Sequence, residues 1–323
     1  MNMNTNDIAV SVRDLEKKFG DFIAVNRINF DVAKGEIFGF LGPNGAGKST
    51  TIGMLCGILS PTSGSGKVGG YDILKEQEKI KQNIGYMSQK FSLYEDLTVE
   101  ENIDFYGGIY KIPSSRKRER KEWIMKMAGI ETFRSSLTRT LSGGWKQRLA
   151  LGCAIIHEPK IFFLDEPTSG IDPIARKNFW DLIKEMARKG VTVFVTTHYM
   201  DEAENCDRMA LIYRGSIIAM GTPSELKTKY MRDDVLQIDV PSPEGWIERL
   251  TALDGVKDAA LFGTSIHAVV SDATRAQDAM KNMFENEKIK DYRINKIQAS
   301  LEDVFVALIE AYDKKANDES KKN

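Results

Sequence analysis

The sequence predicts an α/β protein with a parallel core sheet, followed by a smaller α+β domain. Strand-sized apolar runs alternate with helical stretches between residues 36 and 213, which is typical of strand–helix–strand units with parallel strands. A glycine-rich stretch at residues 42–49 stands between an apolar strand and a helix. The pattern changes near Met231, so we expect two domains, residues 1–230 and 231–312, and a disordered charged tail at 313–323.

The charges and the apolar content exclude several classes of protein. Lys and Arg number 45 and Asp and Glu 46, and this net charge of −1 disfavours a protein that coats nucleic acid. No apolar run approaches the length of a membrane span, and the polar N-terminus has no secretory signal. The cysteines, Cys56, Cys153 and Cys206, are an odd, widely spaced set typical of reduced thiols. We therefore expect a cytoplasmic globular protein.

The first domain is predicted to begin with an antiparallel edge hairpin and to contain a helical insertion. Residues 8–12 and 28–32 alternate between apolar and polar side chains and are joined by a turn around Gly20. Residues 98–154 have helical spacing and form the insertion. The core strands are expected at 36–41, 84–87, 161–164, 191–196 and 209–213, and the helices between them at 47–59 and 173–189.

The second domain has the order strand, helix, strand, strand, helix, strand. These elements are expected at 235–240, 244–253, 256–262, 265–270, 272–286 and 291–297. This order is that of the ferredoxin-like α+β sandwich. A last helix is expected at 301–312, with Ser300 as its cap and Asp303 at the third position of its first turn.

The glycine-rich stretch matches the phosphate-binding loop pattern G-x-x-x-x-G-K-[ST]. Its backbone N–H groups and the following helix N-terminus can bind phosphate oxygens, Lys48 can reach the β and γ phosphates, and Ser49 can ligate Mg²⁺. A plain glycine-rich turn is the alternative, which the position between strand and helix disfavours. The loop residues expected to bind the nucleotide are Gly42, Asn44, Gly45, Gly47, Lys48, Ser49 and Thr50.

Two acidic residues follow the apolar strand at 161–164. Asp165 is expected to hold Mg²⁺ through water, and Glu166 to orient or deprotonate the attacking water. An apolar strand that ends in two acids is common, so the pair gains its meaning from the loop that precedes it. Together the two motifs predict hydrolysis of a nucleoside triphosphate.

The order of further motifs is more specific. Gln89 follows a strand, Leu141-Ser142-Gly143-Gly144 precedes the acidic pair, and Ser169-Gly170-Ile171-Asp172 and then His198 come after it. With the phosphate-binding loop, this order resembles the ATP-binding subunit of an ABC transporter over residues 8–230. The sequence departs from the family at Trp145, where glutamine is normal. We expect this indole to pack against the partner subunit or the coupled membrane protein, and the alternative is an exposed surface tryptophan.

The resemblance implies a head-to-tail dimer that closes on two MgATP. Ser142, Gly143 and Gly144 of one copy would contact the γ phosphate held by the other copy. Gln89 and His198 would contact the same phosphate, and the metal set would be Ser49, Gln89 and Asp165. Asp172 would couple the two sites, and Phe19 would stack on adenine in place of the usual tyrosine. The residues with catalytic roles are then Glu166, His198 and Gln89.

The resemblance also implies partners and a location. Residues 299–305, Ala-Ser-Leu-Glu-Asp-Val-Phe, resemble the closing motif of ABC-2 type, drug-efflux-like exporters. We therefore expect an ATPase that powers export through a separate integral membrane permease, as a homodimer at the inner face of the membrane and without nucleic acid. The alternatives are a soluble clamp on nucleic acid or ribosomes and an inactive structural partner. The basic run at 116–121 could bind nucleic acid, but it lacks interleaved aromatic residues and is expected to be a solvated helix face.

Overall fold

The computed structural model describes residues 7–89, 92–231 and 233–320, with only the backbone at 316, 317, 319 and 320. The chain divides into two compact units, Met1–Pro223 and Ser224–Asn323, which are treated separately. Helix α8 (Pro223–Tyr230) starts at this division, seven residues before the predicted domain boundary. In the described part of the chain, no helix combines the length and the apolar character that crossing a membrane requires.

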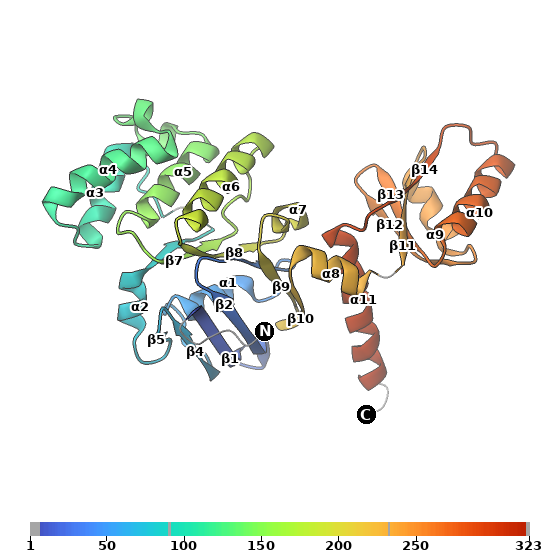
Figure 1. Ribbon diagram of the computed structural model, residues 1–323, viewed down its shortest axis with the longest axis horizontal. Helices are drawn as coiled ribbons and strands as arrows, with labels where there is room; N and C mark the ends of the chain where they lie inside the picture. The colour runs from blue at the N-terminus through green and yellow to red at the C-terminus, as the bar shows by residue number, and fades with distance from the viewer. Residues whose placement is uncertain (1–6, 90–91, 232, 321–323) are drawn as a thin grey trace. The chain divides into compact units, whose positions relative to one another are not determined.

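The first unit contains a six-stranded core sheet with the order β10-β9-β3-β8-β7-β6 (Figure 1). Five strands are parallel, as the sequence predicts, and β10 pairs antiparallel with β9. The strand β10 was not predicted. It follows a two-residue turn at Arg214 and Gly215, both with positive φ, which is the geometry that tight hairpins require. The bounds are β3 (Ile37–Leu41), β6 (Ile84–Met87), β7 (Ile161–Asp165), β8 (Thr192–Thr197), β9 (Arg208–Tyr213) and β10 (Ser216–Gly221).

The N-terminal hairpin does not lie at the edge of this core sheet, as the sequence had suggested. Strands β1 (Ile8–Phe19) and β2 (Phe22–Ala33) form a separate antiparallel sheet with β4 (Ser63–Val68) and β5 (Tyr71–Asp72). The strand β4 is not among the strands that the sequence predicts. Gly64 has φ +85°, and a Cβ there would lie 2.2 Å from Asp14 O, so a glycine lets the two strands approach.

Apolar side chains from both sheets and from α1 (Lys48–Leu55) form the main core. Phe30 of the antiparallel sheet stacks on Phe38 of the core sheet with ring centroids 5.6 Å apart. The ring centroids of Phe40 and Phe194 lie within 6.0 Å of that of Phe30. Aromatic side chains bury large areas, so this cluster stabilises the packing of one sheet on the other. The glycine-rich loop is thereby held on a rigid support.

A helical insertion with its own core lies between β6 and β7. It comprises α3 (Val99–Ile109), α4 (Ser114–Ala128) and α5 (Gly143–Ala154). Helix α3 begins with a capping box in which Thr98 and Glu101 bond each other's backbone N–H groups. The remaining helices of the unit are α2 (Gln77–Asn83), α6 (Pro173–Arg188) and α7 (Met200–Ala203).

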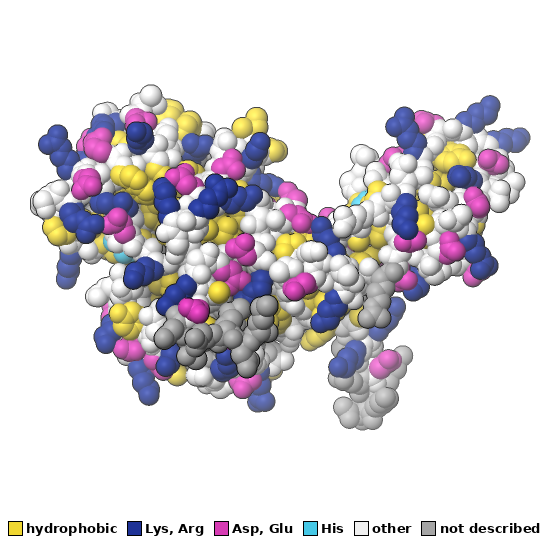
Figure 2. All heavy atoms as spheres, viewed as in Figure 1, with side chains coloured by type: hydrophobic (Ala, Val, Ile, Leu, Met, Phe, Trp, Pro, Cys, Tyr) yellow, Lys and Arg dark blue, Asp and Glu magenta, His cyan; other side chains and the backbone are white. Residues whose placement is uncertain are grey.

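The basic run at 116–121 is part of α4, and several of its cations form ion pairs. Arg120 lies 3.2 Å from Glu158, and Lys121 lies 3.0 Å from Asp104. On the face drawn in Figure 2, basic and acidic side chains are interspersed over the molecule. The predicted solvated face therefore holds for only part of the run, because Arg116 and Arg118 are exposed whereas the Arg120 and Lys121 side chains are only 12% and 14% exposed.

The second unit has the ferredoxin-like topology. Its four antiparallel strands have the order β12-β13-β11-β14, and α9 and α10 contribute apolar side chains to the core of this unit. Their bounds are β11 (Asp234–Asp239), α9 (Ile247–Thr251), β12 (Val256–Phe262), β13 (Ser265–Val270), α10 (Ala273–Asn286) and β14 (Arg293–Ile297).

The C-terminal helix is longer than the sequence indicated. Helix α11 (Leu301–Ser320) continues through most of the segment that was expected to be disordered, and 321–323 lie outside the described residues. Its start matches the expectation, because Asp303 accepts from Ser300 N at 2.6 Å and donates its own N–H to Ser300 Oγ at 3.1 Å. Extension of an existing helix adds one hydrogen bond per residue fixed, so a charged segment can continue it at low cost.

Candidate nucleotide-binding site

The glycine-rich loop connects β3 to α1 and has no room for side chains at two of its glycines. Gly47 has φ +108°, and a Cβ there would lie 2.4 Å from Ala24 O. At Gly42 a Cβ would lie 2.2 Å from Ile212 O. Only glycine fits these positions, which explains the spacing of the pattern. Asn44 and Gly45 are exposed at the tip, Thr50 is half-buried, and the N-terminus of α1 faces the loop.

Two backbone carbonyl groups and one carboxylate hold the Lys48 side chain inside the loop. Its Nζ donates to Gly42 O at 2.8 Å and to Pro43 O at 3.0 Å. The same Nζ lies 3.0 Å from Glu166 Oε1, and the two side chains are only 4% and 7% exposed. A buried ammonium in this position can act as a fixed positive charge for a phosphate.

Asp165 and Ser49 lie together, as the sequence predicts for a magnesium site. Ser49 Oγ donates to Asp165 Oδ1 at 3.1 Å, and Thr196 Oγ1 donates to the same oxygen at 2.7 Å. Burial raises the pKa of Asp165, and the nearby Glu166 adds to the rise, while the two hydroxyl groups oppose it. A bound cation would offset the free-energy cost of burying the ionised carboxylate. Hydroxyl and carboxylate oxygens are ligands that Mg²⁺ prefers.

Thr196 is a site residue that the sequence reasoning missed. It faces Asp165 across the parallel pair β7–β8, and its Oγ1 accepts from Glu166 N at 2.9 Å. It thus orients both acids. The available signal was the pair of hydroxyl residues at the carboxyl end of a core strand, Thr196 and Thr197.

Glu166 is the centre of a small network. Its Oε2 accepts from Gln89 Nε2 at 3.1 Å and lies 3.2 Å from His198 Nδ1, while Oε1 faces Lys48. Its φ of +48° is unusual for a residue other than glycine, and such conformations cluster at functional sites. The structure therefore brings together, from α1 and the ends of three core strands, the predicted residues Lys48, Ser49, Gln89, Asp165, Glu166 and His198.

Other predicted residues lie apart from this network. Ser142 is exposed at the start of α5 and, although it is the N-cap residue, its side chain makes no capping bond. Asp172 caps α6, since its Oδ1 accepts from Ile174 N and Ala175 N at 3.0 and 2.9 Å. Gly143 begins α5, and Gly144 follows it. A Cβ at Gly144 would lie 3.0 Å from that of Ala175, so the starts of α5 and α6 are in close contact.

The two aromatic residues singled out in the sequence, Phe19 and Trp145, differ in how far the protein covers them. Phe19 ends β1 and is 51% exposed, and Lys17 Nζ lies over one face of its ring, 5.0 Å from the centroid. Trp145 is half-buried within the helical insertion. It packs on Phe133 with centroids 4.9 Å apart, and the Arg148 guanidinium lies 4.9 Å from its ring. Trp145 is thus partly covered by residues of its own chain, and its packing on a partner stays a prediction.

This fold and site define a nucleotide-binding domain of the phosphate-loop class. Residues 25–169 match the family model "ABC transporter", and residues 139–200 match an "AAA domain, putative AbiEii toxin, Type IV TA system". The chain is 52% identical over 228 residues to the probable multidrug ABC transporter ATP-binding protein YbhF of Escherichia coli (strain K12). That match covers 71% of this chain but only 39% of the length of YbhF.

A further relative matches over nearly its whole length. The linearmycin resistance ATP-binding protein LnrL of Bacillus subtilis (strain 168) is 37% identical, over 82% of this chain and 86% of LnrL. Among solved structures, cbiO1 of Clostridium perfringens, part of the ABC transporter complex cbiONQ, has a TM-score of 0.64 at 32% identity. That likeness covers 69% of this chain and 92% of cbiO1. The chain belongs to the ABC transporter family, among its ATP-binding proteins.

Proposed function

We propose that this chain hydrolyses ATP to ADP and phosphate and so powers export by a separate membrane-spanning partner. The observation that carries the proposal is the network of Lys48, Gln89, Glu166 and His198 beside the phosphate-binding loop. ATP-binding subunits of this family hydrolyse ATP to power transport. The relatives named for multidrug transport and for linearmycin resistance support export, and they do not favour a clamp on nucleic acid or ribosomes.

The residues of the network have distinct roles in the proposed hydrolysis. Lys48 supplies a fixed charge for the β and γ phosphates, and His198 and Gln89 orient the γ phosphate. Glu166 orients the attacking water and accepts its proton. Ser49 and Asp165 would hold Mg²⁺, with Gln89 beside them, and the ion would neutralise charge that develops on the phosphates.

A second copy of the chain would complete each site. Ser142 and Gly143 lie exposed at the N-terminus of α5, where backbone N–H groups favour an anion. Nearby on α6, Ile174 is 75% exposed although it is apolar. A head-to-tail homodimer would cover this surface and bring Ser142, Gly143 and Gly144 to the nucleotide bound by the other copy. In that arrangement Asp172 lies at the interface and Phe19 stacks on adenine.

An integral membrane permease is the second partner of the proposal. Tyr94 contacts Phe105 of α3 with ring centroids 4.5 Å apart, and both are exposed together with Ile109. An exposed aromatic patch of this kind is typical of a protein interface. Docking of the permease here would place the chain at the inner face of the membrane.

The exchange Glu166→Gln tests the proposed hydrolysis and dimer. The amide keeps the size of the side chain but cannot accept the proton, so hydrolysis should fall by about 10²- to 10⁴-fold while MgATP binding remains. The ATP-bound dimer should then accumulate in light scattering. Glu119→Gln, on an exposed part of α4, is the matched control. Hydrolysis at the wild-type rate, or no increase of dimer with ATP, would contradict the proposal.

The exchange Phe105→Asp tests the permease surface. A charge in an apolar interface costs binding energy, so the variant should no longer co-purify with a membrane protein from solubilised membranes. Leu74→Asp is the control, because Leu74 is also exposed but lies after β5. Equal recovery of the membrane partner with both variants would rule out this surface.

A further inference from the structure

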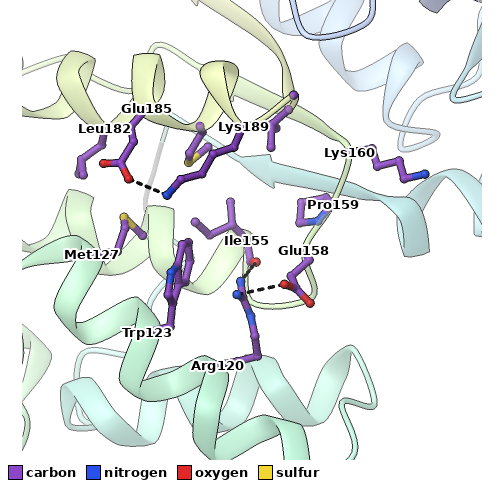
Figure 3. Close-up of a pocket in the computed structure, with 13 residues that line it drawn as sticks. Arg120, Trp123, Met127, Ile155, Glu158, Pro159, Lys160, Leu182, Glu185 and Lys189 are labelled. Carbon is purple, nitrogen blue, oxygen red and sulfur yellow. Dashed lines mark hydrogen bonds and ion pairs between the residues drawn. The ribbon is translucent and has the colours of Figure 1, made fainter.

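A cavity lies at the opposite end of the core strands from the nucleotide site (Figure 3). It has a volume of about 360 Å³ and lies where β7 and β8 begin, whereas Asp165 and Thr196 lie near their carboxyl ends. Helix α4 of the insertion forms one wall and the last two turns of α6 form the other. Pockets of about 300–1,000 Å³ take small molecules rather than macromolecules.

The walls of the cavity present apolar side chains that the protein itself does not cover. On α4, Trp123 and Met127 face the cavity and are half-buried, whereas Ile124 and Ala128 of the same helix are buried in the core of the insertion. Leu182 of α6 is also half-buried. In Figure 3 the Trp123 and Met127 side chains point from α4 toward α6. An apolar ligand body would remove this surface from water.

The charges of the cavity favour an anion. Arg120 lies 3.2 Å from Glu158, and Lys189 lies 2.6 Å from Glu185. Glu158 also pairs with Arg116, so two guanidinium groups share this carboxylate and, beside the Lys189–Glu185 pair, one positive charge is left over. Burial lowers the pKa of Arg120 more than Glu158 raises it, which indicates that its charge is incompletely compensated.

Two of these cations flank the aromatic wall. The Arg120 guanidinium carbon lies 4.2 Å from the Trp123 ring centroid, and Lys189 Nζ lies 5.8 Å from it. Arg120 is further held by hydrogen bonds to Ile156 O and Ile155 O at 3.2 and 3.3 Å. The Arg120 guanidinium is therefore fixed next to the apolar surface, which prepares the site for a ligand with both apolar and anionic parts.

We propose that this cavity binds a small amphipathic molecule with an apolar or aromatic body and a single anionic group. The body packs against Trp123, Met127 and Leu182, and the anionic group lies beside Arg120 and Lys189. A nucleotide does not fit this chemistry, because its several phosphate charges exceed what a net charge of +1 and a site without a glycine loop can neutralise. Such a ligand contacts both the helical insertion and the core.

A pair of matched dyes tests the proposal on the full chain. 8-Anilinonaphthalene-1-sulfonate has an aromatic body with one sulfonate, and N-phenyl-1-naphthylamine has the same body without charge. Titration followed by dye fluorescence and calorimetry should give about one strong site per chain and about tenfold tighter binding of the sulfonate. Binding should persist with saturating MgATP. Equal affinities of the two dyes, or displacement by MgATP, would overturn the proposal.

Variants locate the site. Trp123→Ala removes the aromatic wall and Met127→Trp fills the cavity, and each should weaken sulfonate binding by about fivefold or more. Trp145→Phe, outside the cavity, should not. Lys189→Gln should reduce the preference for the sulfonate over the neutral dye, whereas Lys126→Gln, which is exposed on α4 and does not line the cavity, should leave it unchanged. Thermal unfolding checks each fold. If Trp123→Ala unfolds, Met127→Trp decides alone, and unchanged binding by that variant would overturn the assignment.

Discussion

At the scale of single residues, the buried Lys48 ammonium contacts three oxygen atoms that accept from it. Its Nζ contacts Gly42 O, Pro43 O and Glu166 Oε1, all within 3.0 Å. A mobile surface lysine would lose side-chain entropy on binding a phosphate, whereas this one is already ordered. The position of the charge is therefore a property of the loop.

The exchange Lys48→Ala should lower the affinity for MgATP. It removes a charge-assisted hydrogen bond, worth about 1.5–3 kcal/mol, which corresponds to about 10- to 160-fold weaker binding. Calorimetric titration with MgATP measures the change, and Lys126→Ala is the control. Since Glu166 loses its cation in this variant, thermal unfolding should be recorded in parallel. Unchanged affinity would mean that the loop does not bind phosphate.

His157 is a second residue whose environment changes a measurable property, the pKa of its side chain. Its ring stacks on Tyr110 with centroids 3.6 Å apart, and its Nε2 lies 3.0 Å from Ile84 O. Burial lowers the pKa of His157 to about 4. The ring is thus neutral in the folded protein at neutral pH, where Nε2–H donates to the carbonyl.

This lowered pKa should make the fold sensitive to acid. Below pH 6.5 the unfolded chain gains a proton that the folded chain accepts only near pH 4, so stability falls with falling pH across this window. The loss to pH 4.5 should be about 2 kcal/mol greater than in His157→Gln, after allowance for partial exposure. Urea unfolding of both proteins at pH 7 and 4.5 measures it. Equal losses would show that His157 is not neutral in the fold.

At the scale of helices and strands, the contact of α4 with α5 depends on one glycine. A Cβ at Gly152 of α5 would lie 2.3 Å from Cγ2 of Ile124, which is buried in α4. The two helix backbones can therefore approach more closely than side chains would allow. The insertion owes its compact core to this contact, since Ile124 is a member of the core.

The exchange Gly152→Ala should destabilise the insertion in spite of the higher helix propensity of alanine. Overpacking costs about 1–3 kcal/mol, and the gain in propensity is about 1 kcal/mol, so a net loss of about 1 kcal/mol is expected. Ile124→Ala removes the clashing methyl, so the double variant should lose less stability than the two single losses added together. Denaturant unfolding of the four proteins forms the cycle. Strict additivity would contradict the close contact.

At the scale of the whole molecule, each unit has a core made from its own residues. The main core and the insertion core contain residues from Ala9 to Ile212, and the ferredoxin-like core contains residues from Leu236 to Phe284. A unit with its own core can in principle fold alone. The nucleotide site identified above lies entirely in the first unit.

The fragment of residues 1–230, the proposed first domain, should therefore fold without the rest. We expect a cooperative thermal transition and an affinity for MgATP within about threefold of the full chain, because the loop and the acidic pair keep their supports. Calorimetry and titration measure the two quantities. A fragment that is molten or fails to bind MgATP would show that the second unit stabilises the first.

The sequence by itself determined the elements and motifs that depend on neighbouring residues. Runs such as 161–164 predicted core strands, and the spacing of Gly42, Gly47 and Lys48 predicted the loop. Ser300 and Asp303 predicted the start of the last helix, which the structure confirms. In each case the physics is local, since glycine conformation, helix capping and the alternation of apolar residues act within a few positions.

The tertiary structure decided what depends on residues far apart in the chain. The N-terminal hairpin pairs with β4, the strand that contains Gly64, in a separate sheet. Thr196 donates a hydrogen bond to Asp165, and Trp145 packs on Phe133 within the insertion. The cavity beside Trp123 likewise needs α4 and α6 at their folded separation. Side-chain contacts between distant segments arise only when the cores form, because apolar burial selects which surfaces meet and local propensity does not.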